Sequence, residues 1–394
     1  MTDSALASAV AGRSEEWSAD PGLGVYAHIP FCRHRCHYCD FNTYEGQDSI
    51  HDAYVDALVR HIELHDSGHG PATSVFFGGG TPTLLPPPHL ARILEAIRER
   101  VGVAPDAEIT VEANPETVDE ESFAALLVAG FNRVSIGVQS LVPHVLLGLG
   151  RTHSASSALA AIAAARRAGF EDVNADLIYG SQWESTEDWR RSLDGIIAAG
   201  PDHISAYALT IESGTPLATL VATGRISDVD PDVQAERHSI ASELLGAAGY
   251  HRYEVSNWAR PGRASRHNVL YWSAGDYLGF GAGAHAHIDG ERSWSVRLPR
   301  EFIARVTRGQ PVEAGGEALD EDARAGEALM LGLRLASGID LDGFTVRFGP
   351  AALAARRPEI KRLEARGLLT REAGRVRIPE EHTLVANEVA GAIL

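Results

Sequence analysis

The sequence predicts an α/β protein, an incomplete (β/α)6 barrel followed by a C-terminal helical domain of winged-helix type. Between about residues 24 and 255, short apolar segments alternate with longer segments whose apolar residues recur every three or four positions. This alternation is typical of strand and helix units stacked around a parallel sheet. After Gly316 the helical pattern resumes and ends in two short strand-like segments around Ala373-Gly374, a hairpin signal.

Six strands and five intervening helices make up the predicted barrel. The strands are expected at 24–28, 73–77, 108–112, 133–138, 172–178 and 203–209. The helices are expected at 51–65, 89–100, 120–129, 155–168 and 187–199. Because a closed barrel of this kind has eight units, six units predict an open one, with its site at the carboxyl ends of the strands.

The chain divides into four expected segments. Residues 1–20 match no periodic pattern and are expected to form a flexible tail. Residues 21–249 form the barrel and residues 317–394 the helical domain. Residues 250–316 are aromatic and rich in Gly and His, without clear periodicity, which favours a functional insertion or lid.

Charge and hydropathy exclude some functions. The net charge of −18 argues against a general nucleic-acid binder. No apolar run is long enough to span a membrane, and the first twenty residues lack a secretory apolar core, so we expect a cytoplasmic protein.

Residues 347–378 carry nine Lys/Arg and three Asp/Glu. A solvated basic face is the favoured interpretation, and a nucleic-acid, membrane-surface or acceptor-protein contact is the alternative.

The three cysteines of the chain, Cys32, Cys36 and Cys39, follow the first expected strand within eight positions. An odd, clustered set is a poor disulfide framework but suits metal ligation. Three thiolates fit a [4Fe-4S] cluster whose fourth iron is free for a chelating amino acid such as S-adenosylmethionine (SAM). A Cys3His zinc site that uses His34 or His37, and a trio of unligated buried thiols, are alternatives.

Further polar residues and glycines lie near the ends of the next strands. They are Gly78, Gly79, Gly80, Thr81, Glu112, Gln139, Asp176 and, between strands, Arg151. Glycines let backbone approach a ligand that a Cβ would exclude, although a tight turn is the simpler explanation. Carboxylates, an amide and a guanidinium are partners for an ammonium, a carboxylate and ribose hydroxyls. Together these groups fit a zwitterionic nucleoside.

The ordered set of the cysteine motif, Gly-Gly-Gly-Thr-Pro, Glu-Ala-Asn-Pro, Gly-Val-Gln-Ser and Asp-Leu-Ile-Tyr-Gly resembles the radical SAM coproporphyrinogen III dehydrogenase family. The resemblance extends from about Gly22 to the C-terminus and implies a radical SAM barrel that holds a [4Fe-4S] cluster and SAM. It implies that Tyr26 lies beside SAM, that Gly79 and Gly80 approach its amino group, and that Arg151 pairs with its carboxylate. Glu112, Gln139 and Asp176 would make the other polar contacts.

The end of the cysteine motif separates two branches of this family. The dehydrogenase branch has a further cysteine two positions after the third, whereas here Cys39 is followed by Asp40 and Phe41. This ending is similar to the HemW heme chaperones, which implies a protein that binds heme and passes it to acceptor proteins, with membrane respiratory enzymes as candidates. The alternative is an oxygen-independent coproporphyrinogen III oxidase of porphyrin biosynthesis, a radical SAM oxidative decarboxylase.

A second motif, H-N-x-x-Y-W, resembles the heme-handling pattern of the HemW branch and comprises His267, Asn268, Tyr271 and Trp272. Imidazole is a common axial ligand of heme iron, and the two aromatic rings offer flat area to a porphyrin, so His267 is the expected ligand. The alternative is a buried polar pair with two core aromatics. His285 is assigned no role, and a cluster-dependent dimer is left open.

Overall fold

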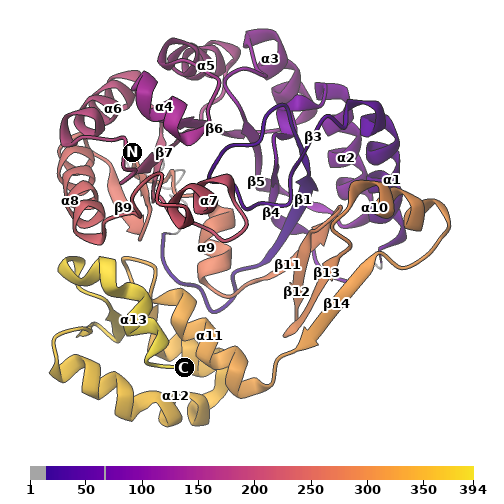
Figure 1. Cartoon of the computed structure of the whole chain (residues 1–394). Coiled ribbons are helices and arrows are strands. Elements are labelled where there is room, and N and C mark those ends of the chain that lie inside the picture. Colours follow the sequence, from indigo (N-terminus) through magenta and orange to yellow (C-terminus); the bar gives the residue numbers. More distant parts are fainter. Residues whose placement is uncertain (1–14, 66–67) are drawn as a thin grey trace, which may run out of the picture.

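The computed structural model describes residues 15–65 and 68–394, and its main element is a mixed sheet that curves without closing into a barrel. All six expected strands are confirmed: β1 (Leu23–Ile29), β4 (Ala72–Gly79), β5 (Val103–Ala113), β6 (Arg133–Gln139), β7 (Val173–Tyr179) and β8 (His203–Ala208). They pair in parallel in this order. Figure 1 shows the helices as an arc around the outside of this sheet.

The expected barrel helices are confirmed too: α1 (His51–Leu64), α2 (Pro87–Arg100), α3 (Glu120–Ala129), α5 (Ala155–Ala168) and α6 (Thr186–Ala199). Local sequence signals fix the ends of α3, α5 and α6. Each begins with a capping box, at Asp119, Ser154 or Ser185, and ends at a glycine with positive φ. The helix α8 (Pro231–Ala247) continues this arc. The short helices α4 (Pro143–Leu149) and α7 (Pro216–Ala222) instead contact the loop that carries the cysteines, since His37 N donates to Leu149 O and Leu217 N donates to His37 O.

Residues 250–316 extend both edges of the sheet. At one edge β10 (Asn257–Ala259) pairs antiparallel with β8, and β9 (His251–Glu254) pairs with β10. At the other edge β11 (Asp276–Phe280) pairs in parallel with β1. The segments β12 (His285–Ile288), β13 (Glu291–Ser295) and β14 (Glu313–Ala318) continue as antiparallel strands, with α10 (Pro299–Thr307) between the last two. The segment expected to be a lid therefore adds strands to both edges of the sheet.

One helix of this segment, α9 (Arg266–Trp272), does not lie on the outer arc. It contacts β1 and β4. In Figure 1 it lies between the barrel strands and the C-terminal helices. The helix that carries the H-N-x-x-Y-W motif is thus an internal packing element.

The C-terminal domain consists of helices and a small sheet, as expected. Its helices are α11 (Glu321–Gly332), α12 (Leu341–Ala365), which is interrupted at Gly349, and α13 (Ala386–Gly391). Its sheet has the order β15 (Ile339–Asp340), β17 (Arg375–Arg377), β16 (Thr370–Glu372). The predicted hairpin is confirmed, because Ala373 and Gly374 both have positive φ, as a tight two-residue turn requires.

The predicted flexible tail falls largely outside the described residues. Within the part that is described, Trp17 is 4% exposed and packs against Phe344 of the C-terminal domain, with ring centroids 6.5 Å apart. The end of the tail is therefore held on the folded domain.

The basic segment 347–378 forms local ion pairs. Arg356 pairs with Asp322, Arg362 with Glu359, and Arg371 with Glu364. These contacts favour the interpretation of a charged face on a packing domain. Within residues 15–65 and 68–394, no helix combines the length and the apolar character needed to cross a membrane.

Candidate functional site

A cavity of about 440 Å³ opens at the carboxyl ends of the barrel strands. Eleven of the residues predicted from the sequence line it: Cys32, Cys36, Cys39, Gly79, Gly80, Thr81, Glu112, Gln139, Arg151, Asp176 and Asn268. They come from the loop after β1, from the ends of β4, β5 and β6, from the segment between α4 and α5, from β7, and from α9. The fold thus brings together residues that are far apart in the sequence.

The loop that carries Cys32, Cys36 and Cys39, called the cysteine loop below, packs against the glycine segment at the end of β4, Gly78–Gly80. Gly80 N donates to Ile29 O (2.8 Å), and Thr81 N donates to Phe31 O (2.8 Å). A Cβ on Gly80 would lie 2.5 Å from Phe31 O, so only glycine fits there. The Thr81 hydroxyl also donates to Cys32 Sγ at 3.8 Å. Gly80, which was expected to approach the SAM amino group, therefore contacts the cysteine loop.

Arg151 connects the cysteine loop to the end of β6. Its guanidinium donates to Cys36 Sγ (3.3 Å) and to Gly137 O (2.9 Å).

Burial raises the pKa of the Cys32 thiol to about 11 and also raises the pKa of Cys39. These thiols therefore carry protons at neutral pH until a metal displaces them. A guanidinium beside sulfur suits a metal-bound thiolate.

The donor set fits an iron–sulfur cluster better than a Cys3His zinc site. His34 Nδ1 lies 3.3 Å from a Glu45 carboxylate oxygen, and His37 Nδ1 is hydrogen-bonded to Gly148 O (3.2 Å). Neither ring is directed to the thiols by these contacts. Among the described residues, no three His, Cys, Asp or Glu side chains are grouped so as to hold a single metal ion. Three thiols spread around one cavity suit a larger cubane.

Gln139 and Glu112 occupy unusual local environments at the rim. Gln139 has φ of 64°, a left-handed conformation that is costly for a non-glycine residue, next to a bulge in the β6–β7 pairing. Glu112 accepts a hydrogen bond from Gly79 N (3.1 Å). Its burial, with the nearby charge of Asp176, raises its pKa to about 8. A cationic ligand beside Glu112 would favour its ionised form.

Two predicted SAM residues, Tyr26 and Gly78, do not line this cavity. The Tyr26 ring lies at an adjacent cavity, and its hydroxyl is hydrogen-bonded to His28 Nδ1 (3.0 Å). A Cβ on Gly78 would come within 2.8 to 3.1 Å of Phe76, Glu112 and Tyr26, so this glycine makes room for protein side chains.

Sequence reasoning missed several cavity residues, among them Tyr38, Ser135, Asn174 and Tyr207. Asn174 precedes Asp176 by two positions on β7, and the period of a strand places both side chains on the same face. That spacing could have identified it. The same period could have identified Tyr207, because it follows Ser205 by two positions on β8 and both side chains line the cavity.

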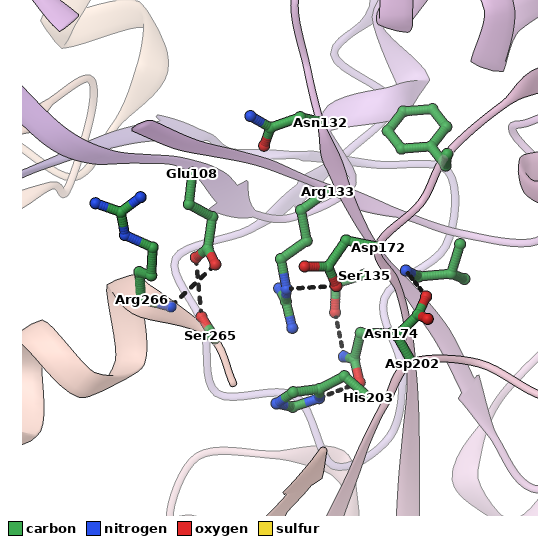
Figure 2. Close-up of polar contacts among 12 residues, drawn as sticks. Glu108, Asn132, Arg133, Ser135, Asp172, Asn174, Asp202, His203, Ser265 and Arg266 are labelled. Carbon is green, nitrogen blue, oxygen red and sulfur yellow. Dashed lines mark hydrogen bonds and ion pairs between the residues drawn. The ribbon is translucent and has the colours of Figure 1, made fainter. Parts of the chain in front are cut away.

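A directed chain of hydrogen bonds joins α9 to this cavity. Asn268 Nδ2 donates to Tyr253 Oη (3.2 Å), which lies 3.0 Å from His203 Nε2. His203 Nδ1 faces the amide oxygen of Asn174 (2.7 Å), so Nδ1 carries the ring proton. Asn174 Nδ2 then donates to Asp176 Oδ1 (2.7 Å). Figure 2 shows the link between His203 and Asn174. The hydrogen bonds of this chain therefore all run in one direction, from Asn268 toward the Asp176 carboxylate.

Glu108 fixes the start of α9. Its carboxylate accepts hydrogen bonds from Ser265 Oγ (3.1 Å), Arg266 N (2.9 Å) and His267 N (3.1 Å), the first two of which are visible in Figure 2. A negative group at a helix N-terminus is stabilising. The Arg133–Asp172 ion pair, 3.5 Å long and almost fully buried, lies in the same view.

His267 lies inside this packed region. It is 1% exposed, its Nδ1 lies 2.9 Å from Ser74 Oγ, and its Nε2 lies 3.0 Å from Tyr271 Oη. Its ring stacks on Phe76 with centroids 5.2 Å apart. The Trp272 ring packs under the Arg334 guanidinium at 4.4 Å. Both ring nitrogens of His267 therefore have protein partners, and Trp272 holds the C-terminal domain.

Comparisons with known proteins define the class. Residues 26–196 match the Radical SAM superfamily, and residues 319–382 match the HemN C-terminal domain. The structure of coproporphyrinogen III oxidase (HemN) from Escherichia coli, a radical SAM enzyme, has the same fold, with a TM-score of 0.81 at 22% identity over 100% of this chain and 93% of that one. The fold and the sequence define a radical SAM protein, a class that implies SAM and a [4Fe-4S] cluster.

Curated relatives narrow the class. The chain is 42% identical over 377 residues to "Heme chaperone HemW" of Mycobacterium tuberculosis, covering 94% of this chain and 95% of the relative. It is 34% identical over 374 residues to "Heme chaperone HemW" of Bacillus subtilis, covering 94% and 98%. The chain belongs to the HemW family.

Proposed function

We propose that this chain is a heme chaperone, which binds heme, holds a SAM-coordinated [4Fe-4S] cluster, and transfers heme to acceptor proteins. The observation that carries the proposal is similarity over almost the whole chain to proteins named heme chaperone. The cysteine loop supports it, because position 41, where the dehydrogenase branch has a further cysteine, is Phe41. The Phe41 side chain is 64% exposed and lines both the first cavity and the cavity beside it.

In this proposal the residues of the first cavity hold the cluster and SAM. Cys32, Cys36 and Cys39 would ligate three irons of the cluster, which, when bound and reduced, would be able to supply an electron to SAM. Arg151 pairs with the SAM carboxylate, and Glu112 and Asp176 accept hydrogen bonds from its ammonium and ribose groups. The chain of donors that begins at Asn268 orients the Asp176 carboxylate.

The proposed heme-handling region includes α9. Tyr271 lines the second cavity, Asn268 lines the first, and Trp272 lines a third cavity of about 300 Å³ beside the C-terminal domain. The first two cavities share Phe41, Gly79 and Glu112. Heme in the second cavity would therefore lie next to SAM.

The test is a heme titration of the anaerobically reconstituted protein, followed by absorbance, with a parallel assay for conversion of coproporphyrinogen III in the presence of SAM and a reductant. Saturable heme binding without turnover is expected. Turnover to protoporphyrinogen IX without stable heme binding would overturn the chaperone proposal and establish the oxidase. Transfer is tested by mixing the heme-loaded chain with an apo-form of a membrane respiratory enzyme and measuring heme on each after separation.

A further inference from the structure

The second cavity is open and lies beside the first. It has a volume of about 720 Å³, within the usual range for small-molecule and cofactor sites. Its walls come from β1, the end of the cysteine loop, the ends of β4 and β5, Tyr271 of α9, β11, and the β12–β13 hairpin. It has aromatic walls and polar groups at the hairpin, the combination that a porphyrin with carboxylate side chains requires.

His285 presents its ring to this cavity from the first position of β12. The residue is exposed, and neither ring nitrogen makes a hydrogen bond to any other described residue. The Trp294 ring lies alongside, with centroids 5.8 Å apart and planes 28° apart, and supports the imidazole. Trp294 in turn covers Gly315, where a Cβ would approach within 2.5 Å of the indole. The imidazole is therefore held in place with its nitrogens free.

The backbone that carries His285 is fixed by β11. Gly279 lies against the His285 carbonyl so closely that a Cβ would have no room. Burial, with the charge of Arg297 nearby, lowers the pKa of His285. The neutral imidazole, which is the form that binds metals, is therefore favoured.

Arg297 supplies a cation at the same cavity. The residue is exposed, its Nε donates to Asn42 Oδ1 (3.3 Å), and it has no carboxylate partner within the described part of the chain. Tyr44 Oη donates to its carbonyl (3.2 Å) and so anchors its backbone. The other guanidinium nitrogens can pair with a carboxylate.

His267 differs from His285 in exposure and in the hydrogen bonds of its ring nitrogens. It is 1% exposed and hydrogen-bonded at both nitrogens, to Ser74 and Tyr271. Iron could reach it only after one of these hydrogen bonds breaks and α9 moves away from β4. Both changes cost free energy, whereas ligation by His285 requires neither.

We propose that heme binds in the second cavity with the His285 imidazole as the axial ligand of its iron and with a propionate paired to Arg297. Tyr277 and Phe41 line the apolar part of this site, and Trp294 orients the imidazole. The inference rests on the proposed function, because it takes heme as the ligand, and it assigns that ligand to a residue outside the H-N-x-x-Y-W motif.

The experiment titrates ferric heme into the cluster-reconstituted full chain and compares wild type with His285→Ala, His267→Ala, Arg297→Gln and His144→Ala. His144 is an exposed histidine on α4, far in sequence from the cavity walls, and serves as the matched control. We expect His285→Ala to weaken heme binding about tenfold or more and to change the spin state of the iron, with partial rescue of the spectrum by added imidazole. Arg297→Gln should weaken binding less and leave the spin state unchanged.

Iron content and thermal unfolding of each variant show that it is folded. A wild-type spectrum and affinity for folded His285→Ala, with an altered spectrum for His267→Ala, would overturn the inference and leave the proposed function standing. Failure of wild type to bind heme would overturn the proposed function itself.

Discussion

The two polar regions of the barrel differ in how their side chains are used. Around α9, the protein satisfies its own polar groups: Glu108 caps the helix, and His267 lies between two hydroxyls. At the two open cavities, thiols, Glu112 and His285 face space. The H-N-x-x-Y-W motif and the cysteine motif are equally distinct in sequence. The two motifs thus differ in burial and in how far the protein itself satisfies the hydrogen bonds of their side chains.

The largest expected effect is at the cysteine loop. Cys36→Ala removes one of three ligands, and we expect it to abolish the visible absorbance of the cluster and most of the bound iron, from about four atoms per chain. Iron analysis after anaerobic reconstitution measures this. Arg151→Met, which keeps all three thiols, is the control and should retain its iron while it loses SAM affinity. Unchanged iron in Cys36→Ala would disprove the ligand assignment.

The comparison of the α9 region with the open cavities predicts a structural role for His267. His267→Ala leaves the Ser74 and Tyr271 hydroxyls without their partner and opens a cavity against Phe76, so we expect a loss of about 2–4 kcal/mol in unfolding free energy. Chemical denaturation measures it. His285→Ala, at an exposed ring, should change stability little. Equal stability of the two variants would contradict the distinction between the regions.

The pH dependence of SAM binding tests Glu112, whose pKa is raised to about 8. A cationic ligand favours the ionised carboxylate, so below pH 8 the protein must lose a proton when SAM binds. Affinity should therefore fall as pH falls, by up to about tenfold per pH unit. Glu112→Gln should remove this dependence. The SAM amino group titrates with both proteins, so the ratio of their dissociation constants isolates Glu112, and a constant ratio from pH 6 to 8 would exclude this role.

The smallest expected effect is at Trp272, which packs under Arg334. Trp272→Phe keeps a ring but weakens the cation–π contact, so we expect a loss of about 0.5–1 kcal/mol. Thermal unfolding should show a small decrease in Tm. The heme spectrum should be that of wild type, because this side chain lies at the C-terminal domain. A spectral change without a change in Tm would place Trp272 at the heme.

The sequence predicted the barrel well because its signals are local. Apolar periodicity and helix caps such as Asp119 and Ser154 identify each unit without reference to distant residues. The strands of residues 250–316 are short and pair with distant partners, so β11, with Gly279 in it, resembles a loop. The cysteine loop was likewise predicted from spacing. The sequence left burial of His267 as the alternative to heme ligation. It could not identify the partners of the ring, because Ser74 and Phe76 lie far away in the sequence.

The parallel pairing of β1 with β11 affects the order in which the molecule is assembled. Leu23 pairs with Asp276, so β1, which leads into the cysteine loop, keeps an unpaired edge until that distant segment has been synthesised. Such long-range pairing is slow to form. The strand that leads into the cysteine loop therefore completes its pairing only after the chain has been synthesised as far as β11.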